Sequence, residues 1–291
     1  MGRKLWVTLV TLAVALALAA PALAAGQSRA AAATPTFNVY AAASLSKVFP
    51  AMVPVFKAKH PTYKHFKFRF NFQGTDVLTA QIEQGAPADV FAGASTKYGD
   101  ALYHGGVAPT FIKAPVNFCQ NKLVVITPAK NPAGITVTSL GQLANPGVVI
   151  AIGDSAVPIG TYTRTVLNNL SNAAAPYLAP YGTPYGTRVL ANAIAQVPNV
   201  NAVVLLVETD NVDAGFCYVS DAHSAGALVK RIVIPNTYQS NPLPTYPIAA
   251  LRHAAHPILA QRWVNFVMGK TGQKLLHKYD FMAKPAVVPA S

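Results

Sequence analysis

Negative charge is scarce in this sequence, and the patterns that mark enzymes are missing. Only ten of the 291 residues are aspartate or glutamate, and no phosphate-binding loop, nucleophile elbow or dinucleotide fingerprint occurs. His253 and His256 are spaced to share a helical face as metal ligands, but Pro257 follows directly and no third ligand is spaced nearby. A secreted metal-dependent hydrolase is therefore the weaker hypothesis. The sequence predicts a protein that is not an enzyme and holds no cofactor or protein-ligated metal ion.

Long apolar runs are confined to the N-terminus. Arg3 and Lys4 precede an uncharged run from Leu5 to Ala20, which is followed by Pro21-Ala22-Leu23-Ala24, a small-x-small cleavage pattern. A membrane anchor needs about 20 apolar residues, whereas this run ends at a helix-breaking proline. We therefore predict a signal peptide over residues 1–24, a flexible alanine-rich linker over 25–35, and a mature protein secreted into the periplasm or extracytoplasmic space.

Cysteine is nearly absent, since only Cys119 and Cys217 occur. Neither lies near the predicted cleavage site, so a thioether lipid cannot be attached at a new N-terminus. In an exported protein the pair could form one disulfide, and two buried thiols are the alternative. Their spacing does not decide between the two.

Positive charge exceeds negative charge, since 23 lysines and arginines face ten acidic residues. The formal net charge of +13 falls to +11 when Arg3 and Lys4 leave with the signal peptide (13 − 2). A basic balance can attract nucleic acid, anionic surfaces or small anions. The basic residues are scattered, however, and their densest group, at 57–69, suits the solvated faces of a helix and a strand. We predict no nucleic-acid partner, and a surface adhesin is kept as an alternative.

Short β-rich runs alternate with amphipathic helical stretches along the mature chain. Apolar residues recur at helical spacing from Leu45 to Phe56, although Pro50 and Pro54 require this helix to be kinked or to begin late. Strands are predicted at 37–40, 66–70, 89–91, 122–127, 148–152, 215–219 and 232–234, helices also at 77–84, 162–170, 201–208 and 260–281, and a long loop at 175–186. This alternation predicts an α/β fold with mainly parallel sheets flanked by helices.

Four segments place small or hydroxyl residues between a predicted strand and the next helix. Ser44 and Thr75 follow the first two strands, and Ile159 and Val200 lie at two later junctions. Helix N-termini present unsatisfied amides and a partial positive charge, which together bind an anion without lysine or arginine. Each junction taken singly is also an ordinary helix cap. The residues alone therefore predict oxyanion binding only in outline.

Four blocks of sequence make the prediction more specific. They are Ala41-Ala42-Ala43-Ser44-Leu45, the run from Gln81 to Phe91 that contains Gly85-Ala86-Pro87-Ala88-Asp89, Gly153-Asp154 with Val157-Pro158-Ile159-Gly160-Thr161-Tyr162, and Gly215-Phe216-Cys217-Tyr218-Val219-Ser220-Asp221-Ala222. Their order and spacing resemble the periplasmic molybdate-binding proteins of ABC transporters from about Phe37 to Phe281. The resemblance implies a monomer that captures molybdate or tungstate and delivers it to the permease of an ABC importer at the membrane. A receptor of the same fold for sulfate, phosphate or a small organic anion is the alternative.

The same resemblance implies a two-lobed, type II periplasmic-binding-protein fold with two hinge-crossing strands. Residues 36–116 and 222–291 would form the first lobe, and residues 117–221 the second. The crossings would fall near Cys119 and Cys217, which favours a disulfide between these two cysteines beside the hinge.

In that family, hydroxyls and backbone amides from both lobes hold the anion. The matching positions here are Ser44, Thr75, Ile159, Val200 and Tyr218. The resemblance implies that Ser44 and Thr75 donate hydroxyl and amide hydrogens, Ile159 and Val200 donate amide hydrogens, and Tyr218 donates its phenol. Asp76 departs from the pattern, because a small hydroxyl residue is common at its position. A carboxylate facing the pocket would repel the anion, so we expect Asp76 to point to solvent from the first turn of its helix.

Overall fold

In the part of the chain that the computed structural model describes, ten strands form two five-stranded sheets. The structure describes residues 34–104, 111–130, 138–172, 181, 184–240 and 243–284. The predicted signal peptide at 1–24, nearly all of the linker at 25–35 and most of the predicted loop at 175–186 lie outside these residues. Within the described ranges, no helix combines the length and the apolar character needed to cross a membrane.

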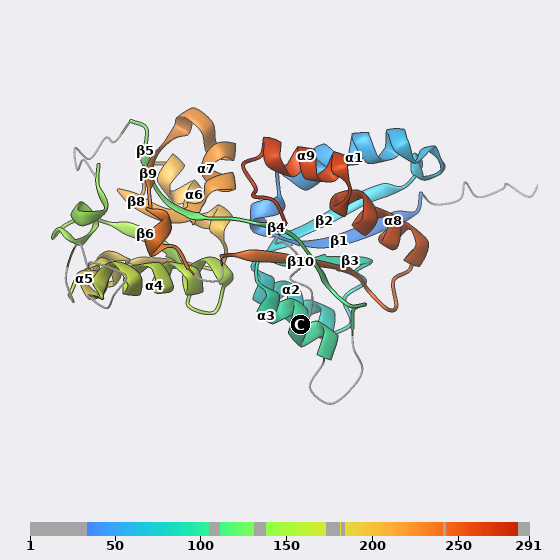
Figure 1. The fold of residues 1–291 in the computed structure, drawn as a ribbon, viewed down its shortest axis with the longest axis horizontal. Helices are drawn as coiled ribbons and strands as arrows, with labels where there is room; N and C mark the ends of the chain where they lie inside the picture. The colour runs from blue at the N-terminus through green and yellow to red at the C-terminus, as the bar shows by residue number, and fades with distance from the viewer. Residues whose placement is uncertain are drawn as a thin grey trace, which may run out of the picture. The chain divides into compact units, whose positions relative to one another are not determined.

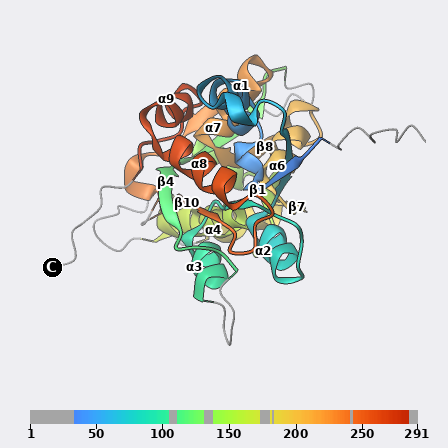
Figure 2. The same cartoon turned by 90° about the vertical axis from the view of Figure 1, so that its right-hand side faces the viewer.

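The first sheet has the strand order β2-β1-β3-β10-β4 (Figure 1). Its strands are β1 (Thr36–Ala42), β2 (Lys67–Gln73), β3 (Val90–Ala92), β4 (Val116–Gln120) and β10 (Thr245–Ala250). Helices α1 (Val48–Lys59), α8 (Pro257–Met268) and α9 (Lys270–Lys278) bury their apolar residues against one face. Helices α2 (Thr75–Glu83) and α3 (Thr96–His104) cover the other face, as Figure 2 shows. We call this sheet with its five helices the first lobe.

The second sheet has the strand order β7-β6-β8-β5-β9. Its strands are β5 (Leu123–Pro128), β6 (Ile150–Gly153), β7 (Ala195–Val197), β8 (Ala214–Tyr218) and β9 (Val229–Val233). Helices α4 (Pro158–Ser171), α5 (Tyr185–Asn192), α6 (Val200–Glu208) and α7 (Val219–Ala225) share one apolar core with it. We call this group the second lobe. Five 3₁₀ turns complete the described structure, at Ala43–Leu45, Pro61–Tyr63, Leu140–Ala144, Gly226–Leu228 and Asn236–Tyr238.

Both sheets are mixed, whereas the sequence predicted mainly parallel ones. β1 runs parallel to β2 and β3, and β6 runs parallel to β7 and β8. β10 and β5, however, each run antiparallel to both of their neighbours. These two strands follow the passages of the chain between lobes, so their direction depends on where the chain enters the sheet and not on a local pattern.

One of the two hinge crossings, the one predicted near Cys217, lies elsewhere in the structure. The chain passes between lobes from β4 to β5, two residues after Cys119, and it is back in the first sheet when β10 begins at Thr245, after β9 ends at Val233. Cys217 instead lies within β8 in the second sheet, paired with Val124. Residues 229–233, which the sequence assigned to the first lobe, form an edge strand of the second sheet, since β9 pairs only with β5 among the described strands. An edge strand pairs with residues that are distant in the sequence, so the residues of β9 alone do not predict its partner.

The predicted disulfide is not present. Cys119 and Cys217 are both free and completely buried. Cys119 lies in the first sheet opposite Tyr246, and Cys217 lies in the second sheet. Burial raises the pKa of both thiols well above the ordinary value, so they are packed as small apolar side chains.

The strand β10, beside the hinge, was not predicted from the sequence because it contains a proline. β10 occupies an interior position between β3 and β4 although it contains Pro247, a residue that disfavours interior strands. The register of β10 against β4 shifts between Tyr246 and Pro247, and this bulge accommodates the missing N–H.

The prolines of α1 were predicted to kink the helix or to require that it begin late, and the late start is correct. The helix begins at Val48, so that Pro50 lies in its first turn and Pro54 alone is interior.

Candidate functional site

A small cavity lies between the two lobes, at the ends of strands that lead into helices. Its volume is about 20 Å³. All five residues predicted from the sequence line it. The complete lining is Ala42, Ala43, Ser44, Gln73, Gly74, Thr75 and Ala94 from the first lobe, and Val157, Pro158, Ile159, Asn199, Val200 and Tyr218 from the second.

Helix N-termini from both lobes meet at this cavity. α2 begins at Thr75 after Gly74, and α4 begins at Pro158 after Val157, and neither N-terminus is capped by a side chain. α6 begins at Val200, where the Asn199 side chain accepts a hydrogen bond only from the amide of Ala202. Uncapped first-turn amides carry hydrogens that await an acceptor and a partial positive charge. The lining therefore provides donors for an anion, although no charged side chain belongs to it.

Two hydroxyl groups of the first lobe line the cavity. Thr75 is buried, and its Oγ1 accepts a hydrogen bond from the amide of Ala94 at 3.1 Å. The hydroxyl hydrogen of Thr75 is consequently available for a ligand. Ser44 is also buried, and its Oγ lies 3.0 Å from the hydroxyl oxygen of Tyr246.

Tyr218 contributes the phenol of the second lobe. It is the last residue of β8 and the N-cap of α7, and it is 1% exposed. Its hydroxyl oxygen is buried without a hydrogen-bond partner in the described part of the chain. Burial, and then the neighbouring Tyr246, raise the pKa of Tyr218 well above its ordinary value, so the phenol keeps its hydrogen. An unpaired buried hydroxyl costs free energy, and a ligand oxygen in the cavity would remove that cost.

The sequence predicted that Asp76 points to solvent, but the structure exposes it only in part. It is the second residue of α2, it is half-buried, and its Oδ1 is buried without a hydrogen-bond partner among the described residues. The Asp76 side chain is nevertheless absent from the lining of the cavity. Asp76 acts on Tyr98, whose pKa is raised first by burial and then by the charge of Asp76.

The lobes touch each other around the cavity. The Tyr98 hydroxyl of α3 donates a hydrogen bond to the carbonyl oxygen of Ala156, and the Asn201 Nδ2 donates to the Ser46 Oγ at 3.2 Å. A methyl group added to Gly74 would lie only 2.6 Å from the carbonyl oxygen of Pro198. The described structure is therefore a closed one, in which donors of both lobes face the same small space.

The histidine pair singled out in the sequence forms no metal site. The amide of His256 donates to the Asp89 Oδ1 at 2.9 Å, and its ring packs against Phe66 at 4.9 Å between centroids. No group of three or more histidines, cysteines, aspartates or glutamates is placed to hold a metal ion within the described ranges.

Asp221 is a residue beside the cavity whose role the sequence did not predict. Its Oδ2 accepts a hydrogen bond from the amide of Tyr218 at 3.1 Å, closing the first turn of α7. Burial raises the pKa of this carboxyl group from 3.8 to about 7, and the bond from Tyr218 lowers it only in part. The signal that could have located it is the aspartate three residues after a strand end, a pattern of helix capping.

The raised pKa of Asp221 predicts that stability falls with pH. The folded protein holds a proton that the unfolded chain releases, so the stabilisation is complete below pH 3.8 and is lost as the pH rises to about 7. Asp221→Asn keeps an acceptor but does not titrate. We expect the unfolding free energy of the wild type to fall relative to this variant by roughly 1 kcal/mol per pH unit across that window. Urea denaturation at a series of pH values measures this, and a constant difference between the two proteins would contradict it.

Known proteins share the sequence and the fold of this chain. Residues 37–282 match the family described as bacterial extracellular solute-binding protein. The molybdate-binding protein ModA of Mycobacterium tuberculosis is 32% identical over 247 residues, which cover 85% of this chain and 84% of that protein.

Two solved structures show the same fold at low identity. The periplasmic molybdate-binding protein of Azotobacter vinelandii has a TM-score of 0.69 at 18% identity, covering 86% of this chain and 100% of that one. The sulfate-binding protein SubI of Mycobacterium tuberculosis has a TM-score of 0.68 at 14% identity, covering 88% of each chain. The predicted two-lobed fold of type II is thereby confirmed.

Proposed function

The chain belongs to the bacterial extracellular solute-binding proteins, and from this we propose that it captures molybdate or tungstate between its lobes for delivery to an ABC importer. The Mycobacterium tuberculosis protein that is 32% identical to this chain is named for molybdate binding. The observation that carries the proposal is the Tyr218 hydroxyl, a buried donor without a partner in the described structure, in a cavity lined by helix N-termini.

The donor set suits a desolvated dianion. Ser44, Thr75 and Tyr218 supply hydroxyl hydrogens, and Ile159 and Val200 supply amide hydrogens from first helical turns. Hydrogen bonds to a charged acceptor are worth about 1.5–3 kcal/mol each, so several such bonds can offset the loss of hydration. Because the donors are neutral, binding does not require the net positive charge of the chain.

The cavity also limits the size of the ligand. Its volume is only about 20 Å³, so a compact tetrahedral oxyanion suits it better than a sugar or an amino acid. Sulfate has the same charge and shape as molybdate and is the second candidate, since a sulfate-binding protein has the same fold.

Delivery requires the lobes to separate. We propose that the two lobes move as units about two connections between the sheets, the one from β4 to β5 at residues 121–122 and the one from β9 to β10. In this proposal the protein acts as a monomer in the periplasm or extracytoplasmic space. It carries no cofactor, and the permease at the membrane accepts the anion from the opened cavity.

Titration calorimetry with molybdate, tungstate, sulfate and phosphate tests the proposed function. We expect heat and a single saturable site with molybdate and tungstate, and weaker binding of phosphate. A rise in the melting temperature accompanies binding, because a ligand at a thousandfold excess over Kd stabilises a protein by about 4 kcal/mol. Absence of heat with both molybdate and tungstate would reject the assignment, and tight binding of sulfate alone would replace it.

A further inference from the structure

A buried tyrosine outside the cavity lies directly behind Ser44. Tyr246 belongs to β10, is completely buried, and does not line the cavity. Its ring centroid is 6.1 Å from that of Tyr218, and its hydroxyl oxygen is 3.0 Å from the Ser44 Oγ. That distance alone does not show which of the two hydroxyls is the donor.

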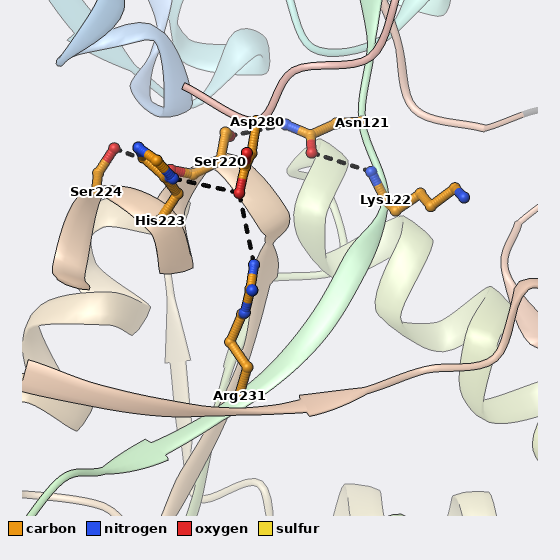
Figure 3. Close-up of polar contacts among 7 residues, drawn as sticks. All are labelled: Asn121, Lys122, Ser220, His223, Ser224, Arg231 and Asp280. Carbon is orange, nitrogen blue, oxygen red and sulfur yellow. Dashed lines mark hydrogen bonds and ion pairs between the residues drawn. The ribbon is translucent and has the colours of Figure 1, made fainter. Parts of the chain in front are cut away.

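Asn121, on the crossing from β4 to β5, indicates the direction of this hydrogen bond. It is completely buried, and its Oδ1 accepts a hydrogen bond from the amide of Lys122 at 3.0 Å, which orients the side-chain amide. The Nδ2 therefore faces the Ser220 Oγ at 2.8 Å and, in a longer contact at the outer limit of hydrogen-bond distance, the Tyr246 hydroxyl at 3.5 Å. Figure 3 shows Asn121 between Lys122 and Ser220 at this crossing.

The hydrogens can be assigned by counting donors and acceptors. An amide NH₂ group only donates, so the Tyr246 oxygen is the acceptor toward Asn121. Burial and the nearby Asp221 raise the pKa of Tyr246 well above its ordinary value, so the phenol keeps its single hydrogen. That hydrogen goes to the Ser44 Oγ, its other hydrogen-bond partner. Ser44 then accepts from behind, and its own hydrogen is left for the cavity.

We propose that Tyr246, held by Asn121, is a positioning residue that fixes Ser44 as a donor and so makes the cavity select fully deprotonated oxyanions. The inference rests on the proposed function and extends it to specificity. Molybdate, tungstate and sulfate offer only acceptor oxygens near neutral pH, whereas hydrogen phosphate carries one O–H. With Ser44 fixed as a donor, that O–H has one acceptor fewer among the cavity hydroxyls. A freely rotating Ser44 could turn a lone pair toward it.

Tyr246→Phe tests the inference by releasing Ser44. Molybdate affinity is measured by calorimetry, and phosphate affinity by displacement of bound molybdate. We expect molybdate binding to weaken by about two- to tenfold, the equivalent of one hydrogen bond. The affinity for phosphate should not weaken in parallel. The ratio of molybdate to phosphate affinity therefore falls by about the same factor or more. Tyr185→Phe is the matched control, because it removes a buried phenol that donates to the Leu140 carbonyl oxygen at 2.6 Å, away from the cavity. It should keep the wild-type preference.

A second pair of variants covers the case in which Tyr246→Phe does not fold. Asn121→Leu removes the donor that orients Tyr246 and should lower the preference for molybdate in the same way. Ser220→Ala removes only the other contact of the Asn121 amide and should leave the preference unchanged. If Tyr246→Phe or Asn121→Leu keeps the wild-type ratio of phosphate to molybdate affinity, the inference is wrong. A wild-type protein that binds no molybdate would reject the proposed function instead, so the two failures are distinguishable.

Discussion

Tyr218→Phe is expected to weaken molybdate binding about 10- to 150-fold without destabilising the unliganded protein. The loss of one hydrogen bond to a charged acceptor corresponds to about 1.5–3 kcal/mol, which gives this factor. In the described structure no protein group pairs with this buried hydroxyl. Its removal therefore relieves a desolvation cost, and the melting temperature should stay constant or rise.

The combination of weaker binding with undiminished stability separates a ligand donor from a structural tyrosine. Tyr185→Phe should show the reverse pattern, since the Tyr185 hydroxyl is paired with the carbonyl oxygen of Leu140. That variant is expected to lose about 0.5–1.5 kcal/mol of stability and to keep its affinity. Calorimetry and thermal unfolding of both variants measure the two patterns. If Tyr218→Phe binds molybdate as tightly as the wild type, the phenol does not hold the anion.

Gly74→Ala is expected to block closure of the lobes. The backbone of Gly74, with φ −56° and ψ 142°, is one that alanine adopts readily. The added methyl group would lie 2.6 Å from the carbonyl oxygen of Pro198 in the second lobe and 2.5 Å from the Asp76 Oδ1. Overpacking of this kind costs about 1–3 kcal/mol. Because separation of the lobes relieves the collision with Pro198, we expect that cost to appear as about 5- to 150-fold weaker binding.

Gly269→Ala is the matched control for this steric test. Gly269 is also the N-cap of a helix with an extended backbone, but its added methyl group would approach no atom closer than 3.2 Å. It should bind molybdate like the wild type. Small-angle X-ray scattering should show contraction on addition of molybdate for the wild type and the control, and little for Gly74→Ala. Wild-type affinity and contraction in Gly74→Ala would show that the lobes do not close at this contact.

The lining of the cavity could be predicted because its residues carry local signals. Ser44 and Thr75 each follow a strand and precede a helix, and a strand end that leads into a helix N-terminus is recognisable from a few residues. Tyr218 could not be found in this way, since a phenol at a strand end has no pattern of its own. Tyr218 was predicted only because the surrounding block of sequence resembles the periplasmic molybdate-binding proteins, and the structure places it in the same cavity.

The residues behind the cavity could not be predicted, because long-range pairing brings them there. Tyr246 lies in a strand that was not predicted because Pro247 belongs to it. Its hydrogen-bond partner Ser44 is 202 residues away in the sequence. Asn121 becomes informative only when the crossing from β4 to β5 is located. The same limit explains the misplaced crossing at Cys217, because the partner of β9 is not encoded in β9 itself.

Crystals grown with molybdate or tungstate test the central claim most directly, because both metals scatter X-rays anomalously. An anomalous difference map should contain a strong peak between the lobes, within hydrogen-bonding reach, through its oxygens, of the Ser44, Thr75 and Tyr218 hydroxyls. The amides of Ile159 and Val200 should complete the shell. A strong peak at another place in a closed protein, or no peak at saturating anion, would contradict the account.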